Sequence, residues 1–179
     1  MNNLIQPHGG KLCELIVPKE DRKHLQNIAL QYPSLTLNDR QLCDFEMLLN
    51  GGFSPLTGFL GKKDYESVLK NNRLSNNIVW PIPITLDVSK EFSKDINISD
   101  KIVLRDHEGV GLGILNITDK WVPDRKKEAE LVYGSIDELH PAVNYLLKQS
   151  GSVYLGGEID GLEYPRHYDY QILRHTPAE

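Results

Sequence analysis

The sequence contains little cysteine and no long run of apolar residues. Its only cysteines, Cys13 and Cys43, have no metal-ligand spacing and form no disulfide framework. We expect both to be small, buried apolar residues. No window approaches the roughly 18 apolar residues of a membrane span, and the first residues, MNNLIQPHGGKL, lack a cationic start and an apolar core typical of a secretory signal. These absences predict a cytoplasmic protein with reduced thiols and no membrane partner.

Signals for catalysis or metal binding are also missing. The six histidines are never three or four residues apart, so no helix can present a paired-histidine metal site. No serine or cysteine stands in a nucleophile-elbow pattern. The glycine-rich stretch LLNGGFSPLTGFLG (residues 48–61) lacks the phosphate-loop pattern, because position 56 is leucine and no hydroxyl residue follows Lys62. We predict no catalytic, cofactor-binding or metal-binding residue, and we interpret the glycine-rich stretch as a packed turn.

The composition is that of a globular domain. Apolar residues make up 40% and charged residues 25% of the 179 residues, which is enough for one core. The formal net charge of −5 disfavours a large nucleic-acid footprint, because such a surface is normally basic.

The chain alternates helix and strand signals. Helices are predicted over 19–30, 63–70, 124–133 and 141–149, and another begins after Asn38, which can cap it while Gln41 reaches back. Ser54-Pro55 is predicted to restart a short helix. Apolar residues at every second position from Ile78 to Val88 predict an eleven-residue edge strand.

Three further stretches have the character of strands. Residues 101–106 and 110–118 flank a turn at 107–109 and predict a hairpin. Residues 153–164 predict the last strand pair. The class is therefore α+β, with a small twisted β-barrel and several packed helices.

Several motifs resemble one family in order along the chain. They are PHGGKL, RQLCDFEMLLNGGFSPLTGFL, WPIPITLDV, HPAVNYLL, YLGGEI and HYDYQILRHTPAE. Together they resemble the N-terminal portion of the ATP sulfurylase (sulfate adenylyltransferase) family. The resemblance implies a PUA-like domain over residues 1–165, a connecting segment over 166–179, and a nucleotidyltransferase domain as partner.

The family makes adenosine 5′-phosphosulfate and pyrophosphate from ATP and sulfate, with magnesium, in sulfate assimilation. Its Gln-x-Arg-Asn and His-x-x-His motifs do not occur in this sequence. The resemblance therefore implies that the parent protein is an enzyme and that this chain is inactive alone, a structural or interdomain module.

The resemblance also implies an interdomain contact in the last residues. Tyr168, Tyr170, Leu173 and His175 are the predicted contact residues, because apolar and aromatic side chains in a polar segment suit a partner surface. A flexible tail is the alternative. A homo-oligomer stays open, as does an RNA-binding module, which rests on fold analogy alone and which the acidic balance disfavours.

Overall fold

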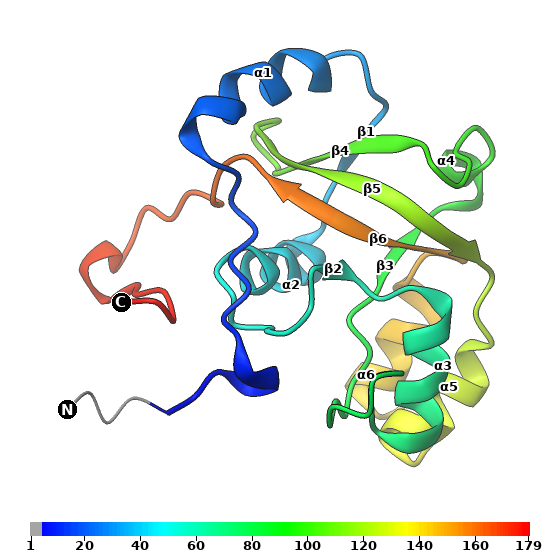
Figure 1. The fold of residues 1–179 in the computed structure, drawn as a ribbon. Helices are drawn as coiled ribbons and strands as arrows, with labels where there is room; N and C mark the ends of the chain where they lie inside the picture. Colours follow the sequence, from blue (N-terminus) through cyan, green and yellow to red (C-terminus); the bar gives the residue numbers. More distant parts are fainter. Residues whose placement is uncertain (1–4) are drawn as a thin grey trace. The chain divides into compact units, whose positions relative to one another are not determined.

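The computed structural model describes residues 5–179, and within them the chain divides into two compact units (Figure 1). Unit 1 contains the chain up to Gly58, Lys101–Asn116 and Glu158–Glu179, and unit 2 contains Phe59–Asp100 and Ile117–Gly157. Two long strands, β5 (Gly111–Trp121) and β6 (Val153–Gly161), run through both units. Residues 1–4 of the predicted 1–165 domain lie outside the described residues.

The strands form one mixed six-stranded sheet in the order β1-β4-β5-β6-β2, and β3 also pairs with β6. The shorter strands are β1 (Ser34–Thr36), β2 (Gly58–Phe59), β3 (Leu86–Val88) and β4 (Lys101–Arg105). β1 pairs parallel with β4, while β4–β5 and β3–β6 are antiparallel. The α+β class is confirmed. Within residues 5–179 the sheet is open and does not close into the predicted small barrel, since β1 and β2 lie at opposite ends of this order.

Unit 1 contains two long helices, and each begins where the sequence predicts it. α1 (Lys19–Ala29) starts directly after Pro18. α2 (Asp39–Leu49) starts with a capping box: the Asn38 side chain accepts from the Gln41 backbone N–H at 2.9 Å, and the Gln41 side chain accepts from the Asn38 N–H at 3.1 Å. This exchange satisfies two backbone donors that the first helical turn otherwise leaves unpaired.

The apolar contacts of unit 1 come from segments far apart in the sequence. Ala29, Val103, Ile114 and Leu162 form one buried cluster, which brings the end of α1 against β4 and β5 (Figure 1). At Gly113 an added Cβ would meet Phe45 Cζ at 2.8 Å and the Asp160 carbonyl oxygen at 3.1 Å. A side chain larger than glycine at this position would collide with these atoms, so the close packing depends on Gly113.

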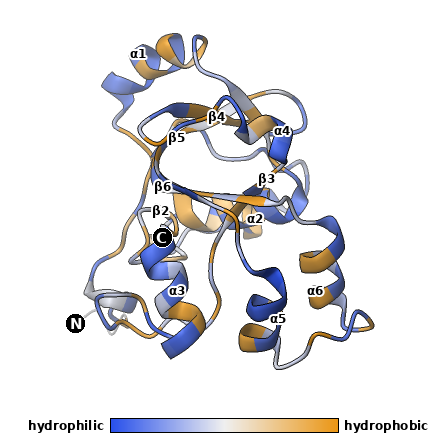
Figure 2. Ribbon diagram, turned by 90° about the vertical axis from the view of Figure 1, so that its right-hand side faces the viewer, coloured by the Kyte–Doolittle hydropathy of each residue, from blue (hydrophilic) through white to orange (hydrophobic). Residues whose placement is uncertain are grey.

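Unit 2 contains the remaining helices. They are α3 (Lys62–Asn71), α4 (Lys90–Ser93), α5 (Arg125–Tyr133) and α6 (Pro141–Asn144), which continues as a π-helical turn, η2 (Tyr145–Gln149). Hydrophilic and hydrophobic stretches alternate along α3, α5 and α6 (Figure 2). Ala129 of α5, Val143 of α6 and Leu146 of η2 form an apolar cluster, as expected for helices that bury one face.

A buried polar network lies beside that cluster. One oxygen of the Glu128 carboxylate accepts from the Tyr65 hydroxyl at 2.8 Å and from the Tyr154 hydroxyl at 3.0 Å. Trp121 packs against both rings, with centroids 5.4 Å from Tyr65 and 5.7 Å from Tyr154. Burial raises the pKa of both tyrosines, and the adjacent Glu128 carboxylate raises it further. The three elements α3, α5 and β6 are thus joined by hydrogen bonds to one carboxylate.

Three sequence predictions about local structure were wrong. The eleven-residue strand is reduced to Leu86–Val88, preceded by an isolated bridge at Val79. Pro81 and Pro83 lack the N–H groups that a strand ladder needs. Burial does not alternate here either, because Ile82 is exposed and residues 83–88 are all buried. Within residues 153–164 there is one strand, β6 (Val153–Gly161), instead of the predicted strand pair.

The third error is at Ser54-Pro55, where the chain forms turns instead of a helix. The Ser54 hydroxyl donates to the Gly51 carbonyl at 2.6 Å and accepts from the Cys13 N–H at 2.9 Å. These bonds fix the turn against the N-terminal strand-like segment. The cysteines also differ from expectation: Cys13 is half-buried and Cys43 is exposed, because Cys43 lies on α2 outside its buried stripe.

Candidate functional site: the exposed C-terminal segment

The C-terminal segment, residues 166–179, presents several large apolar side chains to solvent. Tyr168 is 74%, Tyr170 is 72% and Leu173 is 69% exposed. Ile172, which the sequence prediction missed, is 86% exposed. The fourth predicted residue, His175, is also exposed and pairs with Glu179 of the same segment at 3.6 Å. The four predicted residues therefore all lie on the surface, within one short stretch of chain.

Hydrogen bonds hold the beginning of the segment against unit 1. His167 Nε2 lies 2.8 Å and 2.9 Å from the two oxygens of Glu46 on α2. The Tyr168 hydroxyl donates to Glu108 in the β4–β5 turn at 2.6 Å. That hydrogen bond to a carboxylate raises the pKa of Tyr168. Both acceptors lie on elements of unit 1, so the segment has a defined path where it leaves the domain.

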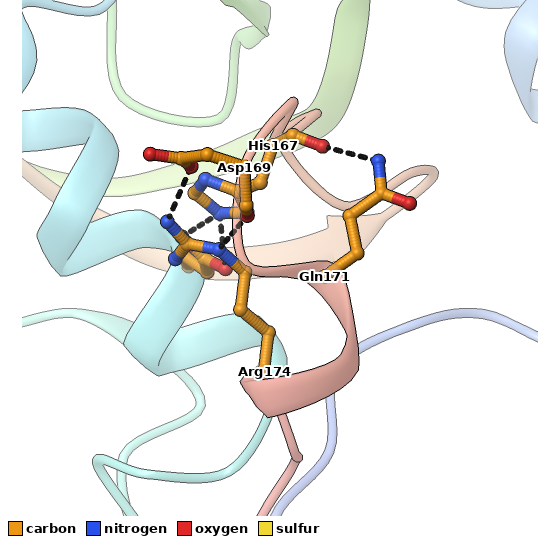
Figure 3. A network of polar contacts seen from close by, with 5 residues as sticks. His167, Asp169, Gln171 and Arg174 are labelled. Atoms are coloured by element: carbon orange, nitrogen blue, oxygen red, sulfur yellow. Dashed lines mark hydrogen bonds and ion pairs between the residues drawn. The ribbon is translucent and has the colours of Figure 1, made fainter.

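The rest of the segment is held by its own side chains (Figure 3). Gln171 Nε2 donates to the His167 carbonyl at 2.8 Å, and Arg174 pairs with Asp169 at 3.3 Å. The short helix η3 (Gln171–Leu173) lies between these contacts. As a result the polar groups satisfy one another, while Tyr170, Ile172 and Leu173 keep their apolar surface open to solvent. Adjacent exposed apolar side chains of this kind make the segment a candidate interaction surface.

The histidines do not assemble into a catalytic group. His107 Nε2 lies 2.9 Å from Asp39 and is exposed, and the His140 ring packs 5.5 Å from the Tyr133 ring at the start of α6. Across residues 5–179 no three His, Cys, Asp or Glu side chains are placed to hold a metal ion. In that same range, no helix has the length and apolarity to cross a membrane. The glycine-rich stretch is packing, since Leu56, Phe59 and Leu60 within it are buried.

Comparison with known proteins identifies the domain type. A family model described as "PUA-like domain" matches residues 5–164. The chain belongs to the PUA-like domain family. The matched range ends just before the C-terminal segment.

The PUA-like domain is similar to curated proteins of greater length. It is 47% identical over 176 residues to a sulfate adenylyltransferase of Eremothecium gossypii, covering 98% of this chain and 35% of that protein. It is 49% identical over 183 residues to a sulfate adenylyltransferase of Candida albicans, covering 97% and 34%. The chain spans about a third of the length of the curated relatives it matches.

The chain is also similar to a solved structure over almost its whole length. The hexameric APS kinase from Thiobacillus denitrificans superposes with a TM-score of 0.77 at 36% identity, covering 98% of this chain and 30% of that one. The PUA-like domain of this chain is therefore similar, over almost its whole length, to a part of several larger proteins.

Proposed function

We propose that this chain is the N-terminal PUA-like module of a sulfate adenylyltransferase, a cytoplasmic enzyme of sulfate assimilation. The reaction is the conversion of ATP, with magnesium, and sulfate to adenosine 5′-phosphosulfate and pyrophosphate. One observation carries the proposal: relatives named sulfate adenylyltransferase match almost all of this chain, at 45–49% identity for the first three. The module covers residues 1–165, and 166–179 connect it to a nucleotidyltransferase domain.

The chemistry itself is assigned to the part of the enzyme outside these residues. Adenylyl transfer needs several cations placed around a triphosphate and a second anion. In the C-terminal segment, Arg174 already pairs with Asp169 of the same segment. Magnesium in such reactions is held by one or two carboxylates together with the substrate phosphates, and across residues 5–179 no three His, Cys, Asp or Glu side chains are placed to hold a metal ion by themselves. The role of the chain is structural.

The C-terminal segment is the proposed contact with the nucleotidyltransferase domain. Two observations support this contact. His167 pairs with Glu46 and so fixes the beginning of the segment, and the side chains of Tyr168, Tyr170 and Leu173 are exposed. A partner that covers these side chains removes apolar surface from water at little cost in chain ordering, because the segment is already positioned. A homo-oligomer is part of the proposal too, since a similar solved protein is hexameric.

Two preparations test the proposal. The first is the 179-residue chain alone. The second is a chimera in which this chain replaces the matching 176 residues of the Eremothecium gossypii relative. Both are assayed for ATP formation from adenosine 5′-phosphosulfate and pyrophosphate. We expect turnover by the chimera and none by the chain alone. Turnover by the chain alone, or a folded chimera without activity, contradicts the proposal.

A matched pair of variants separates the contact from general damage. Tyr170→Ala with Leu173→Ala, introduced into the chimera, is expected to lower activity or the melting temperature, because it removes apolar surface at the contact. Leu30→Ala removes a similarly exposed apolar side chain, 76% exposed in unit 1 outside the segment, and is expected to change neither. Equal effects of both variants argue against the segment as the contact.

A further inference from the structure

A second feature of the molecule lies wholly within unit 2 and serves no purpose in the proposed interdomain role. It is a cavity of about 560 Å³ over the end of β5 and α4, which we call the lysine pocket. Its lining includes three lysines, Lys90, Lys94 and Lys120, together with Trp121 and Val122. The volume is within the range of small-molecule sites, roughly 300–1,000 Å³.

The charge of the lysine pocket is positive and uncompensated. No carboxylate lines it. Within residues 5–179, none of its three lysines forms an ion pair with a carboxylate. An ammonium group that faces a concave, partly desolvated surface without a counter-charge attracts an anion more strongly than one on an open face.

One of the three cations is held in place by the fold. Lys120 extends from β5 to the end of α4, where its ammonium group donates to the carbonyl oxygens of Ser93 and Ile96, the latter at 2.7 Å. An ammonium group has three N–H donors. Two of those on Lys120 are used by the carbonyls, so one is left for a ligand, on a side chain whose position is already fixed.

The aromatic wall of the lysine pocket is equally rigid. Trp121 is 9% exposed and is packed edge-on against Tyr154, with interplanar angle 80°. Its indole N–H is buried and has no hydrogen-bond acceptor in the described part of the chain, an arrangement that costs free energy unless an acceptor arrives. Beside it Val122 is 75% exposed although it follows directly on a core strand. The pocket therefore has an apolar wall in which Trp121 is fixed by packing and Val122 is open to solvent.

A neighbouring cavity of about 670 Å³ lacks these properties. It shares Trp121 and Val122 with the lysine pocket and also contains lysines, but Glu66 and Asp124 line it as well. Lys62 there already faces Glu66 at 3.8 Å. The carboxylates offset the lysine charge, so this cavity has no comparable preference for anions.

We propose that the lysine pocket binds a small aromatic anion. The flat ring lies against Trp121 and Val122, and the anionic group, whether phosphate, sulfate or carboxylate, accepts hydrogen bonds from Lys90, Lys94 and Lys120. Each half of such a ligand meets a feature that the fold leaves unsatisfied: the cations lack a counter-charge, and the apolar wall lacks a covering group. Charge-assisted hydrogen bonds to the lysines supply orientation as well as affinity.

Titration calorimetry on the 179-residue chain tests the proposal. The aromatic anions are 1-naphthyl phosphate, 1-naphthyl sulfate and 1-naphthoate, whose relative affinities identify the preferred anionic group. The two half-ligands are 1-naphthol, with the ring alone, and inorganic phosphate, with the charge alone. We expect the best naphthyl anion to bind at least about tenfold more tightly than either half-ligand, and its affinity to fall as ionic strength rises.

Matched variants locate the binding. Lys90→Gln with Lys94→Gln is expected to lower the affinity for the best naphthyl anion about tenfold. Val122→Ser is expected to lower the affinity for the naphthyl anions and to leave the affinity for inorganic phosphate unchanged. Lys63→Gln with Lys126→Gln removes the same charge from exposed lysines of unit 2 that do not line the pocket, and is expected to have little effect. The proposal is overturned if the naphthyl anions bind no more tightly than phosphate. It is also overturned if the two lysine double variants lose the same affinity.

Discussion

The buried carboxylate of Glu128 gives a prediction whose size follows from its two hydrogen bonds. Tyr65→Phe or Tyr154→Phe removes one hydroxyl donor, at 2.8 Å or 3.0 Å, and leaves both rings in place. A hydrogen bond to a charged group contributes roughly 1.5–3 kcal/mol. Each single variant is therefore expected to lower the free energy of unfolding by about 2 kcal/mol.

The double variant is the sharper test, because it leaves the Glu128 carboxylate without either phenol. Breaking up a buried charge network costs about 3–5 kcal/mol, and neighbouring sites that share one group are not additive. Urea unfolding followed by circular dichroism at neutral pH measures these differences. Tyr32→Phe is the control, because the Tyr32 hydroxyl forms no hydrogen bond within residues 5–179. Single variants that differ from the parent by less than about 0.5 kcal/mol would refute the reasoning.

Three other predictions concern stability. Burial raises the pKa of Tyr65 and Tyr154 above 10.0, so the stability that the two protonated hydroxyls contribute is fully present below that pH. As the pH rises above 10.0, the free energy of unfolding should fall by about 1.4 kcal/mol per pH unit for each tyrosine. Urea unfolding at a series of alkaline pH values should show about half of this fall in Tyr65→Phe. Asn38→Ala removes the cap of α2 and should cost about 1 kcal/mol in the same assay, whereas a cost near zero would mean that the capping box contributes nothing. Gly156→Ala places a Cβ 2.5 Å from the Leu60 carbonyl oxygen and 2.7 Å from Gly61 Cα, and it should cost about 1–3 kcal/mol, seen as a lower melting temperature; an unchanged melting temperature would mean that the backbone there yields freely.

Local signals in the sequence predicted the helices well. The capping pair Asn38 and Gln41 fixed the start of α2, and Asp124 caps α5 by accepting from the Lys127 N–H at 3.1 Å. The hairpin of β4 and β5 was also predictable, because a turn at 107–109 separates two apolar stretches that pair antiparallel. These features depend on residues close in sequence, so periodicity and capping residues are sufficient to find them.

Features set by distant residues could not be found in this way. The alternation from Ile78 to Val88 has the period of a strand, but the strand needs a partner along its full length, and its prolines cannot supply the N–H groups. Glu128 belongs to a run of charged residues at the start of α5, so nothing in the sequence indicates that two tyrosines on other elements bury its carboxylate. Buried polar networks of this kind arise from tertiary packing.

The sequence predicted which residues of the candidate site are exposed, but not the contacts that hold the segment in place. Aromatic and apolar residues in a polar segment indicated Tyr168, Tyr170, Leu173 and His175, and all are exposed. The anchors could not be predicted, because Glu46 lies 121 residues before its partner His167. Their role as an interdomain contact stays a prediction.

The central proposal is that the module contacts the rest of its enzyme through the C-terminal segment. Hydroxyl-radical footprinting with mass spectrometry, applied to the chain alone and to the chimera, measures the reactivity of Tyr168, Tyr170 and Leu173 directly. We expect high reactivity in the chain alone and marked protection of all three side chains in the chimera, with Leu30 equally reactive in both. Equal reactivity of the segment in the two proteins would contradict the proposed contact.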